Sequence, residues 1–233
     1  MSSPSYALIV GVGDGLSASL ARLLAGEGGY KLALAARHPA RLATLAHELD
    51  ALALGCDASD PGQVEALFNQ LDAVFGSAPA VVIYNPSARV RGAITEVDPQ
   101  AVAQALAVSA YGGFLVAQQA ARRMLPRGSG AILFTGASAS VKGYAHSAAF
   151  AMGKFALRGL AQSLARELAP QGIHVAHFVI DGAIRNPGRQ ERPDAPDSML
   201  DPEAIARSYL HVLQQERSAW TWELELRPWL ERF

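Results

Sequence analysis

The chain has 233 residues, of which half are hydrophobic and 18% are charged, and its formal net charge is −1. This length suits one α/β domain with a single substantial core. The near-neutral charge gives no electrostatic basis for binding nucleic acid or an anionic membrane surface. No apolar run is expected to span a bilayer. The N-terminal residues lack the basic region and cleavage pattern of a secretion signal.

The cysteine and histidine content also limits the possible functions. A single cysteine, Cys56, excludes an internal disulfide and favours a reducing, cytoplasmic location. The six histidines are scattered without the spacing of metal ligands, so no metal site is predicted.

Short apolar runs alternate with longer helical patterns along the whole chain. In chain order, the expected elements are a strand at 6–11, a helix at 15–27, a strand at 31–36, a helix at 39–49, a strand at 51–57, a helix from 61, a strand at 80–85, a long helix from 99 that stops before Pro126, a strand at 130–136, a helix at 147–168, a strand at 172–180, a Pro-rich loop at 185–201, a helix at 202–216 and a strand at 220–226. Three helices begin with an aspartate N-cap and a proline: Asp60-Pro61, Asp98-Pro99 and Asp201-Pro202.

Alternation of strands and helices indicates parallel strands, right-handed crossovers and helices on both faces of a sheet. We therefore predict an α/β fold of residues 1–233 as one domain with a doubly wound, Rossmann-like parallel sheet. In such a sheet the ligand crevice lies at the carboxyl ends of the strands.

The first strand runs into a glycine-rich turn, GVGDGL at 11–16. Glycines let the backbone approach a pyrophosphate, which the N-terminus of the following helix binds through free N–H groups. The predicted dinucleotide contacts in this turn are Gly11, Gly13, Gly15 and Leu16. The alternative is a tight strand-to-helix turn without a ligand.

The end of the second strand favours one form of the cofactor. Many NAD sites place an acid there for the adenosine 2′-hydroxyl, but this strand ends Ala35-Ala36-Arg37. Arg37 offers a bidentate partner for a 2′-phosphate, so NADP(H) is predicted over NAD(H). The alternative is a solvated arginine. Asp57, after the third strand, either accepts from the adenine amino group or caps the next turn.

These features, in this order, resemble the short-chain dehydrogenase/reductase family over essentially the whole chain. The matching segments are the glycine turn at 11–17, Cys56-Asp57-Ala58, Tyr84-Asn85-Pro86-Ser87-Ala88, the turn at 135–140 and Lys154. The resemblance implies further cofactor contacts at Asp57, Ala58, Asn85, Pro86 and Lys154. The chain departs from the family pattern at three cofactor segments: Ser17 replaces the third glycine, Asn-Asn-Ala-Gly keeps only Asn85, and Asp181-Gly182 replaces Pro-Gly.

The resemblance also implies a proton relay of tyrosine, lysine, serine and asparagine, and here the chain differs from it. Phe150 stands at the tyrosine position and Ser109 at the asparagine position. The serine position falls on Ala137, or on Ser138 with a one-residue shift. Lys154 alone matches, and it is expected to bind the nicotinamide ribose. Its alternative roles are a lysine that reaches solvent or one that caps a carbonyl.

The predicted catalytic residues are Lys154, Ser138 and Tyr144. Ser138 would contact the substrate oxygen. Tyr144 lies in the loop before the lysine helix and is a hypothetical substitute acid, with an aromatic lid residue as the alternative.

Many small residues on two long helices favour close helix contact: Ala103, Ala105, Ala107, Gly112, Gly113, Ala148, Ala151, Ala156, Gly159, Ala161 and Ala165. The resemblance implies that these helices pair across a two-fold axis in a homodimer or homotetramer. The alternative is packing against the sheet.

The leading function is a divergent, NADP(H)-dependent short-chain oxidoreductase that acts on a small carbonyl or alcohol. The alternative is a non-catalytic NADP(H)-binding sensor or partner protein. The loop at 185–201 shows no substrate preference in its sequence. One interpretation is that Arg185 or Arg189 binds an acidic substrate. The alternative is that both are ordinary exposed arginines.

Overall fold

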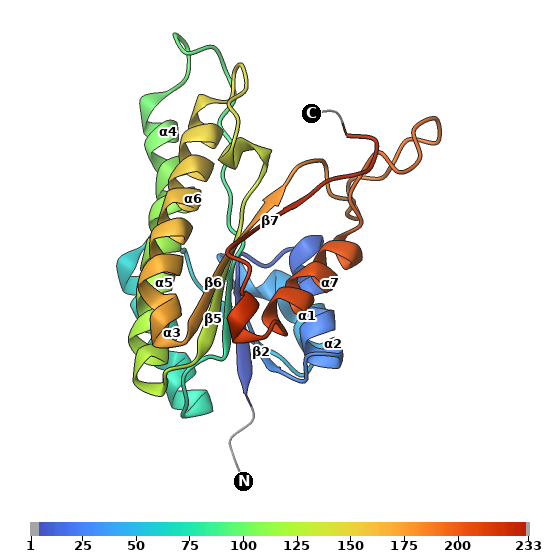
Figure 1. The fold of residues 1–233 in the computed structure, drawn as a ribbon. Helices are drawn as coiled ribbons and strands as arrows, with labels where there is room; N and C mark the ends of the chain where they lie inside the picture. Colours follow the sequence, from blue (N-terminus) through green and yellow to red (C-terminus); the bar gives the residue numbers. More distant parts are fainter. Residues whose placement is uncertain (1–4, 232–233) are drawn as a thin grey trace.

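The computed structural model describes residues 5–231, which form one parallel sheet with helices on both faces (Figure 1). The strand order is β3-β2-β1-β4-β5-β6-β7. The strands are β1 (Tyr6–Val10), β2 (Lys31–Ala36), β3 (Leu52–Gly55), β4 (Val81–Tyr84), β5 (Gly130–Thr135), β6 (Ile173–Ile180) and β7 (Glu223–Leu226). The predicted doubly wound, Rossmann-like fold is confirmed.

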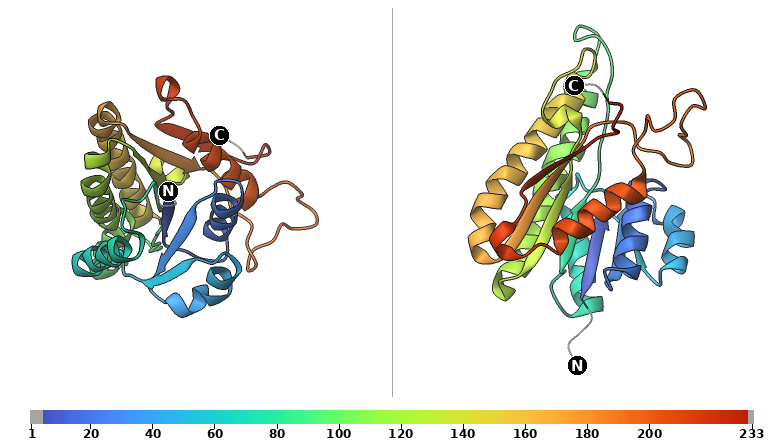
Figure 2. Two further views of the ribbon diagram at one scale, coloured as in Figure 1. Left: turned by 90° about the horizontal axis from the view of Figure 1, so that it is seen from below. Right: turned by 45° about the vertical axis from the view of Figure 1, so that its right-hand side comes forward.

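Two helical layers cover this sheet (Figure 2). One layer holds α1 (Leu16–Gly26), α2 (Ala43–Glu48) and α7 (Pro202–Leu213). The other holds α3 (Pro61–Phe75), α4 (Pro99–Leu106), α5 (Gly112–Met124) and α6 (Ala148–Leu168). Successive residues of β1 belong to different cores, with Tyr6 and Leu8 in one and Ala7 and Ile9 in the other. Both faces of the strand are therefore buried, which explains its lack of polar alternation.

The aspartate–proline pairs act as predicted. The side chain of Asp60 accepts a hydrogen bond from the backbone N–H of Gln63. Asp98 and Asp201 cap α4 and α7 in the same way. Each proline lies in the first turn, where its missing N–H leaves no hydrogen bond unmade.

The long helix predicted from 99 is not regular. A π-helical turn at Ala107–Tyr111 separates α4 from α5, and a 3-10 turn at Leu125–Arg127 follows. The predicted helix at 39–49 is likewise divided into a 3-10 turn (Pro39–Leu42) and α2. The π-helical turn packs closely on α6: a Cβ added at Gly153 would lie 2.8 Å from the Cβ of Ser109.

The expectation that no apolar run could span a bilayer is wrong by the criteria of length and composition. The continuous helical segment Pro99–Arg127 contains a window of mean hydropathy 1.3, which is apolar enough for a membrane span. Buried core helices meet the same criterion. In this fold Val116 and Ala120 of that segment are fully buried in the core between the sheet and α3.

The sheet order places the ligand crevice. β2 and β3 lie on one side of β1, and β4 to β7 lie on the other. The chain therefore leaves β1 and β4 in diverging directions, which opens a crevice at their carboxyl ends. The glycine turn after β1 and the segment from Asn85 after β4 meet at this point, where the backbone N–H of Asn85 donates to Val10 O.

Candidate functional site

Two adjoining cavities lie at the carboxyl ends of the strands. The first has a volume of about 310 Å³ and is lined by the glycine turn, the end of β5, α6 and the 182–189 segment. The second has a volume of about 380 Å³ and lies over the ends of β2 and β3. Gly11, Asn85 and Ser87 line both cavities. Together the cavities form an elongated site across the switch point.

The glycine turn has the backbone geometry that the sequence predicted. Gly11 has a φ of +82°, and a Cβ there would lie 2.7 Å from Pro86, so only glycine fits. A Cβ at Gly13 would meet nothing within 4 Å. Gly13, Gly15 and Leu16 line the first cavity. The bare backbone at this turn leaves room for a group as large as a pyrophosphate beside the start of α1.

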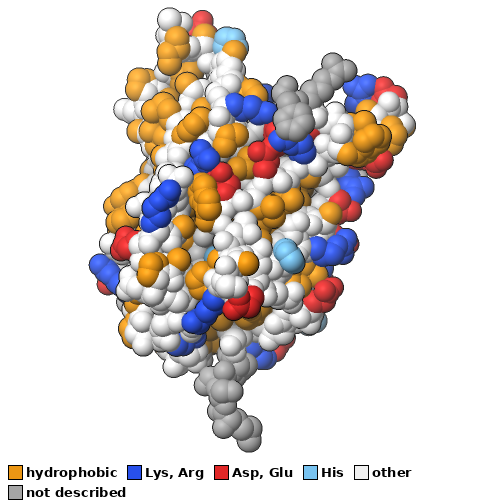
Figure 3. All heavy atoms as spheres, in the orientation of Figure 1, with side chains coloured by type: hydrophobic (Ala, Val, Ile, Leu, Met, Phe, Trp, Pro, Cys, Tyr) orange, Lys and Arg blue, Asp and Glu red, His pale blue; other side chains and the backbone are white. Residues whose placement is uncertain are grey.

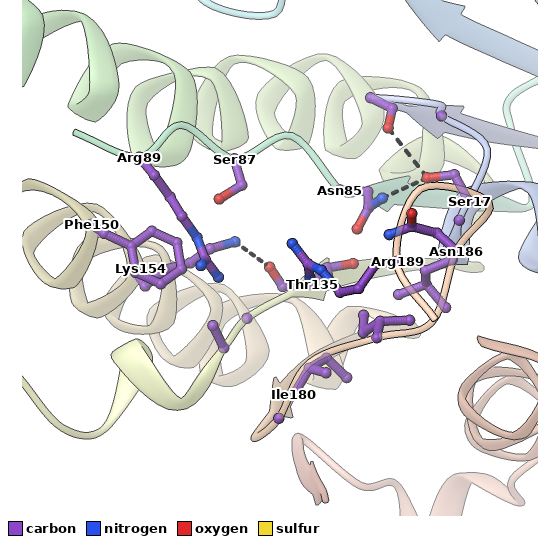
Figure 4. A pocket seen from close by; sticks show the side chains of 18 residues that line it. Ser17, Asn85, Ser87, Arg89, Thr135, Phe150, Lys154, Ile180, Asn186 and Arg189 are labelled. Atoms are coloured by element: carbon purple, nitrogen blue, oxygen red, sulfur yellow. Dashed lines mark hydrogen bonds between the residues drawn. The ribbon is translucent and has the colours of Figure 1, made fainter. Parts of the chain in front are cut away.

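Ser17, in place of the family's third glycine, joins the turn to the segment after β4. Its hydroxyl donates to the carbonyl oxygen of Gly11 at 3.2 Å and accepts from the side-chain amide of Asn85 (Figure 4). Ser17 is buried, with 2% of its surface exposed. A serine therefore fits the helix–strand contact and also fixes Asn85 at the edge of the site.

The second cavity brings together several residues predicted to contact the cofactor. Arg37 and Asp57, predicted for its adenosine half, line it with Ala58 and Pro86. Arg41 lines it too, and sequence reasoning missed this second cation. The available signal was its spacing of four residues from Arg37. The sequence predicted a regular helix there and not the 3-10 turn Pro39–Leu42 that contains Arg41.

Asp57 performs the capping role that the sequence left as an alternative. Its Oδ1 accepts from the Ser59 backbone N–H at 2.9 Å and from the Ser59 hydroxyl at 2.7 Å. These hydrogen bonds, with a smaller contribution from Arg37, hold the pKa of the Asp57 carboxyl below its usual range. The carboxylate is thus ionised, and its contact with adenine stays a prediction.

Lys154 is buried on α6 at the inner wall of the first cavity. Only 2% of its surface is exposed, and its Nζ donates to the carbonyl oxygen of Thr135 at 2.7 Å. Of its two alternative roles, capping a carbonyl is confirmed and reaching solvent is wrong. Burial and the nearby Arg89 guanidinium lower the pKa of Lys154 to about 7. One hydrogen bond leaves further donors of this amine for a ligand.

The Phe150 ring lies one helical turn before Lys154 and lines the same cavity. The Arg89 guanidinium sits over this ring, 4.2 Å from its centroid (Figure 4). Sequence reasoning missed Arg89, which also lines the cavity. No motif marks an arginine at this place, because its contact with Phe150 is made across the fold.

Ser138 and Tyr144 are not among the residues that line either cavity, and their catalytic roles stay predictions. Ala137, the position given by the unshifted reading, lines the first cavity instead. The turn closes when the Ala137 backbone N–H donates to the Ser140 Oγ at 3.1 Å, and this contact leaves Ser138 one residue past the cavity wall. Tyr144 is 45% exposed and is close to Lys142.

A buried polar network holds this turn from below. The Ser140 hydroxyl is hydrogen-bonded to His177 Nε2 at 3.3 Å, and His177 Nδ1 to Glu223 at 3.0 Å. Glu223 also accepts from Arg158 at 2.7 Å. Burial lowers the pKa of His177 to about 4, so its ring is neutral at physiological pH. With Ser140 fully buried, the network supports the turn structurally.

Ser109, at the asparagine position, also has a structural contact. Its hydroxyl accepts from the backbone N–H of Ala88 at 3.2 Å, and the residue is fully buried. It lines neither cavity. It instead anchors the segment after β4 directly beside Arg89.

Comparisons with known proteins agree with this geometry. The family model described as "short chain dehydrogenase" matches residues 5–195. An Escherichia coli (strain K12) enzyme named sorbitol-6-phosphate 2-dehydrogenase is 29% identical over 189 residues, which cover 78% of this chain and 72% of that enzyme.

Solved structures show the same fold. A short-chain dehydrogenase from Rhodopseudomonas palustris is 35% identical, with a TM-score of 0.82 over 97% of this chain and 99% of that chain. An alcohol dehydrogenase from Thermococcus sibiricus, solved in complex with 5-hydroxy-NADP, is 23% identical. Its TM-score is 0.87 over 98% of each chain.

Proposed function

Because the chain belongs to the short-chain dehydrogenase family, we propose that it is an NADP(H)-dependent oxidoreductase that interconverts a small carbonyl compound and its alcohol. The observation that carries this proposal is the shared cavity of the glycine turn and Lys154. A phosphate-accommodating turn and a buried amine thus face one space. Arg37 and Arg41 at the far end of the site supply positive charge for a 2′-phosphate.

In this proposal the nicotinamide nucleotide supplies or accepts the hydride when bound. The backbone at Gly11, Gly13 and Gly15 holds its phosphates beside the N-terminus of α1. Lys154, fixed by the Thr135 carbonyl, donates to the ribose hydroxyls. Phe150 occupies the family's tyrosine position and lines the cavity, but its ring has no exchangeable proton. Water therefore supplies the proton to the substrate oxygen.

A second candidate function is supported by Phe150 itself. Without the tyrosine hydroxyl, a site that keeps its glycine turn and its lysine binds the nucleotide without efficient turnover. A non-catalytic NADP(H)-binding sensor or partner protein has the same binding residues. Turnover, and its response to a restored hydroxyl, separates the two functions.

The cofactor assignment has a direct test in Arg37. We expect the purified protein to bind NADPH at least tenfold more tightly than NADH. Arg37→Gln should weaken NADPH binding by about 10- to 100-fold, because a charge-assisted hydrogen bond to phosphate is lost. NADH affinity should stay within about threefold, since NADH carries no 2′-phosphate. Nucleotide fluorescence titration and the shift in melting temperature measure both affinities.

Arg122→Gln, at an exposed position on α5, is the matched control for the loss of one surface charge. Equal weakening of both nucleotides by Arg37→Gln would contradict the 2′-phosphate role. If the unaltered protein bound neither nucleotide, the oxidoreductase proposal would be abandoned.

We also propose that the protein is a homodimer or homotetramer that pairs through α5 and α6. Large apolar side chains on these helices and the preceding π-helical turn are exposed, namely Tyr111, Phe114, Met152 and Phe155. Hydrophobic side chains are visible over the α4–α6 side of the molecule (Figure 3). Exposed apolar clusters of this kind typically mark association surfaces.

Phe155→Glu should convert the oligomer to monomer, because it places a charge within the apolar contact. Light scattering after size-exclusion chromatography measures the mass. Val74→Glu is the control, since Val74 is a 59% exposed apolar residue on α3, which is not one of the two helices proposed to pair. A monomeric unaltered protein would contradict the proposal.

The compartment that we propose is the cytoplasm. Cys56, the only cysteine, is 3% exposed and unpaired. Burial raises the pKa of its thiol to about 11, so the group is protonated and unreactive. A reduced core thiol suits a reducing environment.

A further inference from the structure

The first cavity is electropositive in its substrate half. Three cationic side chains line it, Lys154, Arg89 and Arg189, and no aspartate or glutamate is among its lining residues. Figure 4 shows Arg89 extending past the Phe150 ring toward Lys154, with Arg189 entering the same space from the other side. Cations gathered without an acid favour a negatively charged occupant.

Arg89 is held in a way that leaves its hydrogen-bond donors available. The guanidinium carbon of Arg89 lies over the Phe150 ring, 4.2 Å from the ring centroid. Cation–π attraction of this kind does not require the guanidinium N–H groups as hydrogen-bond donors. Within residues 5–231, no carboxylate lies within ion-pair distance of Arg89. The two parallel donors of its fork match the two oxygens of a carboxylate.

Neighbouring arginines show that this availability is local. In the loop after β6, Arg185 pairs with Asp201 at 2.6 Å and Arg192 pairs with Asp194. Arg189, between them in sequence, forms no ion pair with any described carboxylate and lines the cavity. The loop thus neutralises its outer arginines and presents the middle one to the site.

The cations also destabilise one another. Burial, Arg91 and Arg189 lower the pKa of Arg89, and Arg89 contributes to the lowered pKa of Lys154. An anion bound between the arginines would relieve this repulsion.

We propose, on the basis of the oxidoreductase function above, that the substrate is a carbonyl compound bearing a carboxylate, which Arg89 binds from its seat on the Phe150 ring. Arg189 adds positive charge from across the cavity. The carboxylate fixes the carbonyl beside Lys154, and the reaction transfers one hydride to the carbonyl carbon from NADPH and one proton to its oxygen from water. The products are the hydroxy acid, NADP⁺ and the hydroxide ion that the water leaves, which solvent buffers neutralise.

The phosphates of the cofactor do not account for Arg89. The glycine turn and Arg37 provide for the pyrophosphate and the 2′-phosphate, and both lie along the strand ends of β1 and β2. Arg89 lies over Phe150 on α6, on the opposite side of the first cavity. Arg189 is closer than Arg89 to the glycine turn. Asn186, three residues before Arg189, would lie 3.3 Å from a Cβ added at Gly15.

The test compares oxo acids with their methyl esters, which differ in charge at nearly constant shape. The pairs are benzoylformate, acetoacetate and levulinate, each with its methyl ester, and they vary the distance between carbonyl and carboxylate. NADPH oxidation gives kcat/KM for each. The melting temperature of the protein with each compound, with and without NADPH, reports binding independently of turnover.

We expect an acid-to-ester ratio in kcat/KM of at least tenfold for the best pair. Arg89→Met should lower this ratio by about 10- to 100-fold, the effect of one charged bidentate hydrogen bond. Arg89→Lys, which keeps the charge without the fork, should give an intermediate ratio. Arg122→Met removes an exposed charge on α5 that does not line the cavity, and it should leave the ratio unchanged.

The possible outcomes distinguish a failure of the carboxylate assignment from a failure of the proposed oxidoreductase function. Failure of NADPH to bind removes the oxidoreductase function. NADPH binding with esters preferred, or used equally well, overturns only the carboxylate assignment. If no compound is reduced, melting temperatures decide: acids that stabilise the unaltered protein but not Arg89→Met support the assignment. The absence of any acid-specific stabilisation overturns it.

Discussion

Phe150→Tyr is expected to raise kcat for carbonyl reduction by about 10²- to 10⁴-fold, the usual contribution of a general acid. Phe150 is 8% exposed and its ring lines the cavity. Lys154 follows four residues later on the same face of α6, so it lies close to an added hydroxyl. A phenol in this place would donate the proton that water supplies in the unaltered protein. The nearby ammonium group of Lys154 would also lower the pKa of this phenol toward neutrality.

Steady-state NADPH oxidation with the best carbonyl substrate measures this gain. Phe150→Leu is the control, since it keeps an apolar side chain without a hydroxyl and should show no gain. An unchanged kcat in Phe150→Tyr, with NADPH binding intact, would count against the oxidoreductase. That result would favour the non-catalytic NADP(H)-binding protein.

Lys154→Met should reduce turnover by about 10²- to 10³-fold, the effect of removing one aligned donor from an active site. It should also change how stability depends on pH. The pKa of Lys154 is about 7 in the folded protein, below its ordinary value of 10.5. Between these values the unfolded chain binds more protons than the folded chain. Stability of the unaltered protein therefore rises with pH across this range, by up to about 1.4 kcal/mol per pH unit from this group.

The Met variant cannot titrate, so the rise due to residue 154 should be absent from it. Urea unfolding at pH 7, 8 and 9 without nucleotide measures the free energy of unfolding of both proteins. Lys142→Met is the matched control: Lys142 pairs with Asp181 at 3.2 Å, and this contact raises its pKa. Its stabilising contribution is lost only above pH 10.5, outside the range tested. If the free energy of unfolding varied with pH in parallel for the unaltered protein and Lys154→Met, burial would not lower the pKa of the Lys154 amine.

Local sequence signals were enough to predict the fold and the glycine turn that lines the first cavity. Apolar runs marked the inner strands of the sheet, because strands covered on both faces need apolar residues throughout, whereas the edge strand β7 alternates glutamate and leucine. Asp60, Asp98 and Asp201 marked helix starts through contacts with residues two or three positions away. Gly11 marked the turn because a positive φ and the closeness of Pro86 both require glycine. Such requirements act within a few residues and are therefore visible in sequence.

The substrate end was decided by tertiary structure. Ala137 faces the cavity and Ser138 does not, because Ser140 and His177 beneath the turn set its path. The cation–π contact of Arg89 with Phe150 connects the segment after β4 to α6, two parts of the chain that only the folded sheet brings together. Sequence by itself determined the order of strands and helices, the glycine turn after β1 and the placing of Phe150 one helical turn before Lys154. Which charged groups share the remaining space depends on side-chain contacts between distant segments, and no local pattern encodes them.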